Sequence, residues 1–221
     1  MTQENRTDWF MFGIAAALAL FGAMMVYSAS AIVALQETES GSQYTYFYKQ
    51  IGFTLGGLAA MFIVSKIDYH FFQRSWVVYS MMAVTIVLLL AVFGFPPING
   101  ARRWIRFSGF SFQPSELAKI VLPVFLAYYL TKKEEVVGSL RETVFPCLFG
   151  LGLLGGLVFL EKDLGTTIVL CAIFSAVYFA GGARLIHLGS VAAFLVLVGV
   201  GAIFFAPWRI ARLMAFLDPF K

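Results

Sequence analysis

Long runs of apolar residues alternate with short polar stretches along the whole chain. A helix needs roughly 20 apolar residues to cross the bilayer core of about 30 Å, and each run approaches that length. Seven spans are predicted, at residues 9–35, 51–67, 76–93, 115–131, 144–160, 166–179 and 187–206. The pattern therefore predicts an all-α fold, a polytopic bundle of transmembrane helices.

The composition agrees with this pattern. Hydrophobic residues make up 60% of the chain and charged residues 13%, whereas an ordinary soluble domain has roughly 45–50% and about 25%. The connections between the runs are short and no internal repeat is visible. We therefore expect residues 1–221 to form a single integral membrane domain, with lipid as its solvent.

The net charge of +4 changes the picture little. Its basic residues are dispersed in short loops rather than gathered on one solvated face, so we expect membrane lipids, and not nucleic acid, as partners. Cys147 and Cys171 both lie inside apolar runs, with no histidine at ligand spacing. We therefore predict neither a disulfide nor a metal site.

The distribution of Lys and Arg between the loops does not decide the orientation of the helices. If the N-terminus is cytoplasmic, the outer side carries two clusters of arginine, at residues 102–106 and 209–212. This is the side that usually has fewer basic residues, so the clusters suggest a negatively charged ligand.

The stretch 99–119 mixes cations, aromatics and turn residues before the fourth predicted helix. Pro114 suits the first helical position, which makes Gln113 the N-cap and places Glu116 where its carboxylate can reach free backbone N–H groups. Lys119 lies three residues further on the same face and can extend to the membrane interface. Helix capping and interfacial contact compete here with a functional role, because an ionisable pair at the mouth of a transmembrane helix is costly unless it faces protein or a water-filled cavity.

Arg102, Arg103 and Arg106 also allow two interpretations. They can form an ordinary basic loop that touches lipid phosphates. Alternatively, their guanidinium groups and the positive N-terminus of the following helix converge on a phosphate or pyrophosphate.

A second polar stretch, residues 161–167, lies between the fifth and sixth predicted spans. It can be a simple turn, with Gly165 at the bend and Asp163 near the start of a helix. Asp163 can also supply a carboxylate to a cavity at the outer face. Beyond the last span, Arg209 and Arg212 share one face if that segment is helical.

Five stretches together resemble one family. They occupy residues 25–30 (Met-Val-Tyr-Ser-Ala-Ser), 99–105, 112–119 (Phe-Gln-Pro-Ser-Glu-Leu-Ala-Lys), 163–166 (Asp-Leu-Gly-Thr) and 209–219. In this order they are similar to the SEDS family of polytopic membrane proteins (FtsW, RodA and SpoVE), and most similar to its division members.

The resemblance implies a peptidoglycan glycosyltransferase that polymerises lipid II at the outer face of the bacterial inner membrane, at the division septum. It implies a supporting catalytic role for Glu116 and Lys119. The residues that it assigns to substrate binding are Arg103, Gln113, Ser115, Asp163, Arg209 and Arg212. The expected partners are a class B penicillin-binding protein, which is a transpeptidase, and other divisome proteins. No cofactor is expected, although a divalent cation on the pyrophosphate stays open.

The chain also departs from the family. Family members have about ten transmembrane helices, of which about seven are expected here, and their essential aspartate lies in an outer loop after the seventh. We therefore expect this chain to lack that loop, the last helices and the catalytic base, and to be inactive alone. The family motif Gln-Pro-Asp-Leu-Gly-Thr is changed here to Glu161-Lys162-Asp163-Leu-Gly-Thr.

Two other functions stay open at this point. A lipid II flippase or other transporter would use Glu116, Lys119 and Asp163 as a proton relay or substrate path. A non-catalytic divisome scaffold would tolerate alanine at Glu116 and Lys119.

Overall fold

The computed structural model describes residues 8–37, 44–98, 100–107, 110–133 and 139–182, with isolated helical positions at 189, 193, 196, 199 and 201. Contacts within the chain divide it into two units, residues 1–71 and 72–221. Each unit is described by itself. The expectation of a single membrane domain stays a prediction.

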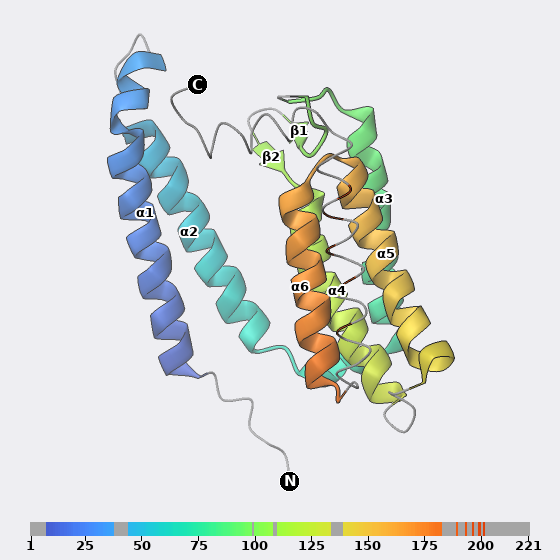
Figure 1. Cartoon of the computed structure of the whole chain (residues 1–221). Coiled ribbons are helices and arrows are strands. Elements are labelled where there is room, and N and C mark those ends of the chain that lie inside the picture. The colour runs from blue at the N-terminus through green and yellow to red at the C-terminus, as the bar shows by residue number, and fades with distance from the viewer. Residues whose placement is uncertain are drawn as a thin grey trace. The chain divides into compact units, whose positions relative to one another are not determined.

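The first unit is a pair of helices, α1 (Trp9–Glu37) and α2 (Tyr44–Ser65), which lie side by side in Figure 1. The carboxylate of Asp8 begins α1 by accepting hydrogen bonds from the backbone N–H groups of Phe10 (3.0 Å) and Met11 (3.1 Å), as an N-cap residue does. Aromatic rings join the start of α1 to the end of α2, with 6.2 Å between the Phe12 and Phe62 ring centroids. The two helices are therefore antiparallel.

In the described residues up to 182, the second unit contains a bundle of four helices, α3 (Ser75–Ala91), α4 (Pro114–Lys132), α5 (Phe145–Leu160) and α6 (Leu164–Ala180). Two 3-10 turns, η1 (Tyr69–Gln73) and η2 (Val92–Gly94), flank α3, and a π-helical turn, η4 (Leu140–Val144), precedes α5. Helix α4 contacts α3, α5 and α6, as Figure 1 shows. It is therefore central to the described part of the bundle.

Between α3 and α4 the chain forms a small antiparallel hairpin of β1 (Ile105–Phe107) and β2 (Phe110–Phe112), with Ile105 opposite Phe112. Ile105 is buried, and Arg103, just before the hairpin, donates a hydrogen bond to the carbonyl of Lys162 between α5 and α6. The hairpin thus places the loop that contains Arg103 at the end of the bundle where α4 begins (Figure 1).

The bundle core is apolar and depends on close helix packing. Buried residues of α5 recur at helical spacing, at Cys147, Leu151, Leu154 and Val158. A Cβ atom added at Gly150 would lie 2.4 Å from the ring of Phe125 in α4. The absence of a side chain at this position therefore lets α4 and α5 approach each other, as small residues do between membrane helices.

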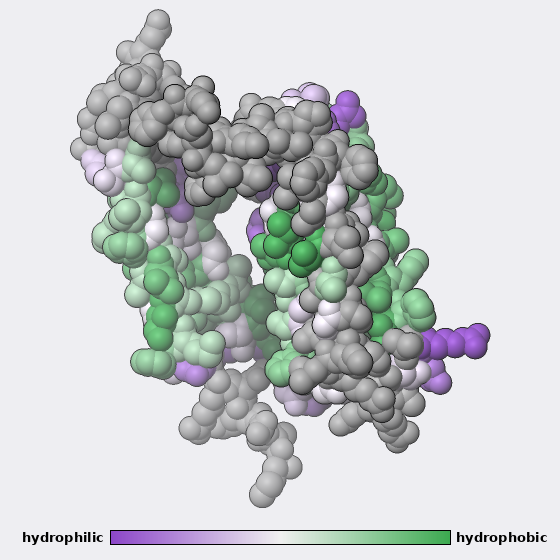
Figure 2. Space-filling model, in the orientation of Figure 1, coloured by the Kyte–Doolittle hydropathy of each residue, from purple (hydrophilic) through white to green (hydrophobic). Residues whose placement is uncertain are grey.

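Four segments of the described chain are long and apolar enough to cross a membrane: Trp9–Ala29, Phe47–Ser65, Ser75–Gly94 and Arg141–Leu160. Leu164–Ala180 is apolar but shorter. Figure 2 shows hydrophobic residues over the helical surfaces, with hydrophilic residues mostly near the helix ends. The predicted all-α, polytopic membrane fold is confirmed, while the span predicted at 187–206 lies outside the described residues except for the isolated positions.

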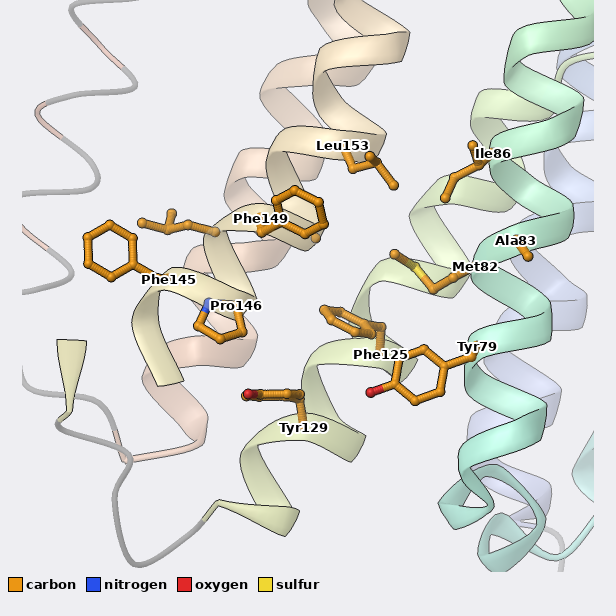
Figure 3. Close-up of a pocket in the computed structure, with 12 residues that line it drawn as sticks. Tyr79, Met82, Ala83, Ile86, Phe125, Tyr129, Phe145, Pro146, Phe149 and Leu153 are labelled. Atoms are coloured by element: carbon orange, nitrogen blue, oxygen red, sulfur yellow. The ribbon is translucent and has the colours of Figure 1, made fainter. Parts of the chain in front are cut away.

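An apolar groove of about 940 Å³ opens between α3, α4 and α5. Figure 3 shows four of the aromatic side chains that line it, Phe125 and Tyr129 of α4, Tyr79 of α3 and Phe149 of α5. These residues belong to the half of the bundle where α4 ends, away from the hairpin. The groove is therefore separate from the polar cluster described next.

Candidate functional site

A cluster of polar residues lies at the hairpin end of the second unit. Three parts of the chain meet there: the loop before β1, the start of α4 and the turn between α5 and α6. The side chains come from residues as far apart as 103 and 163, so only the folded bundle brings them together.

The turn between α5 and α6 has a specific backbone geometry. The N–H of Lys162 donates to the carbonyl of Phe159 (3.0 Å), and the N–H of Asp163 donates to that of Val158 (3.3 Å). These are the two bonds of a Schellman motif, whose extra residue is left-handed and usually glycine. Here that residue is Lys162, with φ 65°. The expectation that Gly165 makes the bend is wrong, since Gly165 lies inside α6.

Asp163 is the N-cap of α6 and is only 6% exposed. Its carboxylate accepts hydrogen bonds from the backbone N–H (3.1 Å) and hydroxyl (2.9 Å) of Thr166, and from the side-chain amide of Gln113 (3.0 Å). Its backbone carbonyl accepts one from the Thr167 hydroxyl (2.7 Å). The prediction that Asp163 lies near a helix start is confirmed, and its carboxylate also joins α6 to α4.

Gln113 is the N-cap of α4 and Pro114 its first helical residue, as predicted. The Gln113 side chain makes no capping bond. Its amide donates instead to Asp163 and to the hydroxyl of the buried Ser115 (2.9 Å). Gln113 and Ser115 therefore hold the start of α4 against the start of α6.

Arg103 points into this cluster from the loop before β1. Its guanidinium donates to the backbone carbonyl of Lys162 and lies 3.8 Å from a carboxylate oxygen of Asp163. Its Nε is buried and has no hydrogen-bond partner among the described residues. Arg102 turns elsewhere and donates to the carbonyl of Phe93 (2.6 Å), and Arg106 is exposed. Of these three arginines, Arg103 is the one whose guanidinium lies in the polar site.

Glu161 is a buried acid to which the sequence pattern assigned no functional role, although it departs from the family motif. It directly follows the span Arg141–Leu160, is 1% exposed, and neither of its carboxyl oxygens has a hydrogen-bond partner among the described residues. Burial raises the pKa of Glu161 to about 8, and the Asp163 charge adds to this while Arg103 opposes it. The signal in the sequence was an acid placed directly at the end of an apolar run.

Glu116 and Lys119 form an ion pair of 2.7 Å on α4, with side chains 55% and 31% exposed. Among the described contacts, the Glu116 carboxylate binds Lys119 rather than a backbone N–H group. No described contact joins this pair to Asp163. The structure thus brings together Arg103, Gln113, Ser115 and Asp163, and leaves Glu116 and Lys119 beside them, while Arg209 and Arg212 lie outside the described residues.

The donor set of the cluster suits an anion better than a metal. Within the described residues, no three His, Cys, Asp or Glu side chains converge on one point. Arg103 and the N-terminus of α4, which has no side-chain cap, supply positive potential, whereas the N-terminus of α6 is already capped by Asp163. Helix N-termini favour negatively charged groups. The divalent cation considered above stays a prediction.

Fold and cluster together define a multi-pass helical membrane protein with a buried polar site at one end of a bundle. Residues 8–221 match the model of the FtsW/RodA/SpoVE family, described as "Cell cycle protein". The chain belongs to this family.

Similar proteins of known name agree with this assignment. The chain is 33% identical over 229 residues to "Probable peptidoglycan glycosyltransferase FtsW" of Geobacter sp. (strain M18), covering 100% of this chain and 60% of the relative. It is 35% identical to the protein of that name from Trichlorobacter lovleyi, covering 96% and 55%. It is 32% identical to "Stage V sporulation protein E" of Bacillus subtilis, covering 100% and 60%. The chain thus spans little more than half the length of these relatives.

Solved structures share the fold. A chain of the structure described as "Structural coordination of polymerization and crosslinking by a peptidoglycan synthase complex" aligns with a TM-score of 0.62 and 25% identity, over 91% of this chain and 60% of that one. The rod shape determining protein RodA of Thermus thermophilus aligns with a TM-score of 0.53 and 25% identity, over 79% and 58%.

Proposed function

We propose that a protein containing this chain polymerises lipid II into the glycan strands of peptidoglycan during bacterial cell division. The observation that carries the proposal is Arg103. Lys162 and Asp163 orient its half-buried side chain, yet its Nε has no hydrogen-bond partner among the described residues. The names of the relatives support the reaction class. The inner membrane, at the division septum, is the proposed location.

The proposed reaction transfers the growing glycan from its lipid pyrophosphate to the 4-hydroxyl of an incoming lipid II sugar. The bond between the glycan and the pyrophosphate breaks, and negative charge develops on the leaving group. A preorganised cation at that point lowers the barrier, because its attraction grows as the charge develops. Arg103 suits this role, since guanidinium groups match phosphate oxygens in two-point hydrogen bonds.

The neighbouring residues position Arg103 rather than react. The carboxylate of Asp163 accepts hydrogen bonds from Thr166 and Gln113, so it is suited to hold the helix ends together. The Lys162 carbonyl fixes the direction of the guanidinium. Glu116 and Lys119 lie beside this cluster on α4, where we propose that they support substrate binding. The resemblance assigns the general base to an outer loop of the family rather than to these residues.

The proposed partners follow from the proposed polymerisation of lipid II. A class B penicillin-binding protein would crosslink the new strands, and other divisome proteins would bring both enzymes to the septum. A solved structure of this fold comes from a complex described by polymerization and crosslinking, which supports the pairing.

The test measures glycan polymer formed from purified lipid II by the full-length protein with its transpeptidase partner. We expect Arg103→Ala to reduce the rate by about 100-fold, the loss typical for removal of one preorganised donor. Arg141→Ala, an exposed arginine at the other end of the bundle, is the matched control and should leave the rate unchanged. If Arg103→Ala and the control form polymer at the same rate, Arg103 is not part of the substrate site.

The same assay separates the other two functions. Translocation of lipid II without polymer in the wild type would favour the flippase, and the lack of both activities would favour the scaffold.

A further inference from the structure

Two buried polar groups of the site have no hydrogen-bond partner among the described residues, and they belong to residues that interact electrostatically, Glu161 and Arg103. Both carboxyl oxygens of Glu161 and the Nε of Arg103 are without hydrogen bonds in the described part of the chain. Most buried polar atoms in native proteins are hydrogen-bonded, so such exceptions need an explanation. Here a potential acceptor and a potential donor are unsatisfied in the same cluster.

The charges around Glu161 can be named. Asp163 of the same turn and Arg103 of the loop before β1 act on its carboxyl group. The start of α4 adds Gln113 and Ser115, which are neutral, and the ion pair of the exposed Glu116 with the half-buried Lys119. Lys162 is also exposed. Burial disfavours the charged form of a carboxyl group. Glu161 is therefore mainly protonated at pH 7, and Arg103 and Asp163 balance each other's charge.

We propose that Glu161 is a proton-controlled positioning residue for Arg103. When Glu161 is neutral, the guanidinium keeps a donor for a phosphate oxygen. When Glu161 loses its proton to solvent, the carboxylate binds Arg103 and withdraws that donor. The inference rests on the proposed function, because it assumes that Arg103 binds the pyrophosphate of the substrate.

The size of the effect follows from the charge balance. When Glu161 is ionised, Arg103, Asp163 and Glu161 together carry a net charge of −1. The carboxylate of Glu161 then holds the guanidinium, and the negative charge repels a phosphate. If only the neutral form binds, the apparent affinity falls with the fraction of neutral Glu161. With a pKa of about 8, affinity falls about tenfold between pH 7 and pH 9. The proton exchanges with solvent, and no bond other than O–H changes.

Glu161→Gln is the informative variant. It keeps the shape of the side chain and cannot ionise, and it restores the residue of the family motif to which the chain is similar. We expect it to fold. A residue with a purely structural role would show the same pH profile in both proteins, whereas a proton-controlled one would not.

The experiment measures binding of inorganic pyrophosphate to the purified full-length protein by calorimetry at pH 7 and pH 9. The ratio of wild-type to Glu161→Gln affinity is compared, so that the ionisation of pyrophosphate itself cancels. We expect this ratio to fall about tenfold from pH 7 to pH 9, as calculated above for one ionising group. An unchanged ratio would overturn the proposal.

A second measurement separates this inference from the proposed function. Infrared difference spectroscopy should show, at pH 7, the carbonyl band of a protonated carboxylic acid that is missing in Glu161→Gln. Because Arg103 favours the ionised form, Arg103→Gln should move the loss of this band to higher pH. If the wild type binds no pyrophosphate at either pH, the phosphate site fails, and the infrared titration still decides the coupling. No acid band at pH 7, or no shift in Arg103→Gln, would overturn it.

Discussion

At the scale of single residues, the site depends on which side-chain groups already have hydrogen-bond partners. The carboxylate of Asp163 accepts hydrogen bonds from the start of α6 and from Gln113, whereas the Nε of Arg103 has no partner among the described residues. Glu161 is buried with no partner among the described residues. The fold therefore tolerates an unsatisfied acid and an unsatisfied donor side by side, which is typical of functional rather than purely structural positions.

The buried Glu161 predicts an unusual pH dependence of stability. Its pKa is raised from 4.5 to about 8 in the folded protein, so the folded state holds the proton over this range while the unfolded state releases it. Stability is then lost as pH rises from about 4.5 to about 8. We expect Glu161→Gln to raise the melting temperature more at pH 8 than at pH 5. The corresponding gain in the free energy of unfolding is a few kcal/mol at most, since one pKa unit corresponds to about 1.4 kcal/mol.

Thermal unfolding of the detergent-solubilised protein at both pH values is the measurement. Glu116→Gln changes an exposed glutamate on α4 and is the matched control. If Glu161→Gln and wild type differ by the same amount at pH 5 and pH 8, Glu161 does not carry a proton in the folded protein.

At the scale of elements, the sequence predicted helix positions better than it predicted the turn. Apolar length alone located the helices from α1 to α6, and Pro114 marked the start of α4 correctly. The second helix begins at Tyr44, earlier than its apolar run, because the polar and aromatic residues before the run also fit a helix. The bend at Lys162 was missed because a lysine with positive φ carries no local signal, and the nearby Gly165 was the more typical choice.

The packing of α4 against α5 predicts a strong effect at Gly150. Its missing side chain admits the ring of Phe125, and an added Cβ atom would lie 2.4 Å from that ring. We expect Gly150→Ala to destabilise the protein by roughly 1–3 kcal/mol, as overpacking of a well-filled core does. Gly152→Ala on the same helix is the control, since nothing lies within 4 Å of its added Cβ atom.

Melting temperatures of the two glycine variants are compared with wild type, and Gly150→Ala is then combined with Phe125→Leu. The smaller side chain should recover part of the loss. Equal melting temperatures for the two glycine variants would show that α4 and α5 are not in this close contact.

At the scale of the whole molecule, the site comes from contacts that no local pattern contains. Residues 103 and 162 are joined by a hydrogen bond, and so are 113 and 163. The motifs similar to the family indicated Arg103, Gln113 and Asp163 individually. Their convergence required α4 and α6 to pack side by side, which depends on apolar contacts spread along both helices. The burial of the Glu161 carboxyl group, without a hydrogen-bond partner among the described residues, is likewise a property of the folded bundle.

The central claim is that Arg103 binds the pyrophosphate of the lipid-linked substrate. An experimental structure of the full-length protein with its transpeptidase partner and lipid II tests it most directly. We predict a phosphate oxygen about 3 Å from the Arg103 guanidinium, the distance of a hydrogen bond, at the end of the bundle where α4 and α6 begin. A pyrophosphate bound elsewhere, with Arg103 still engaged only by Lys162 and Asp163, would contradict the account.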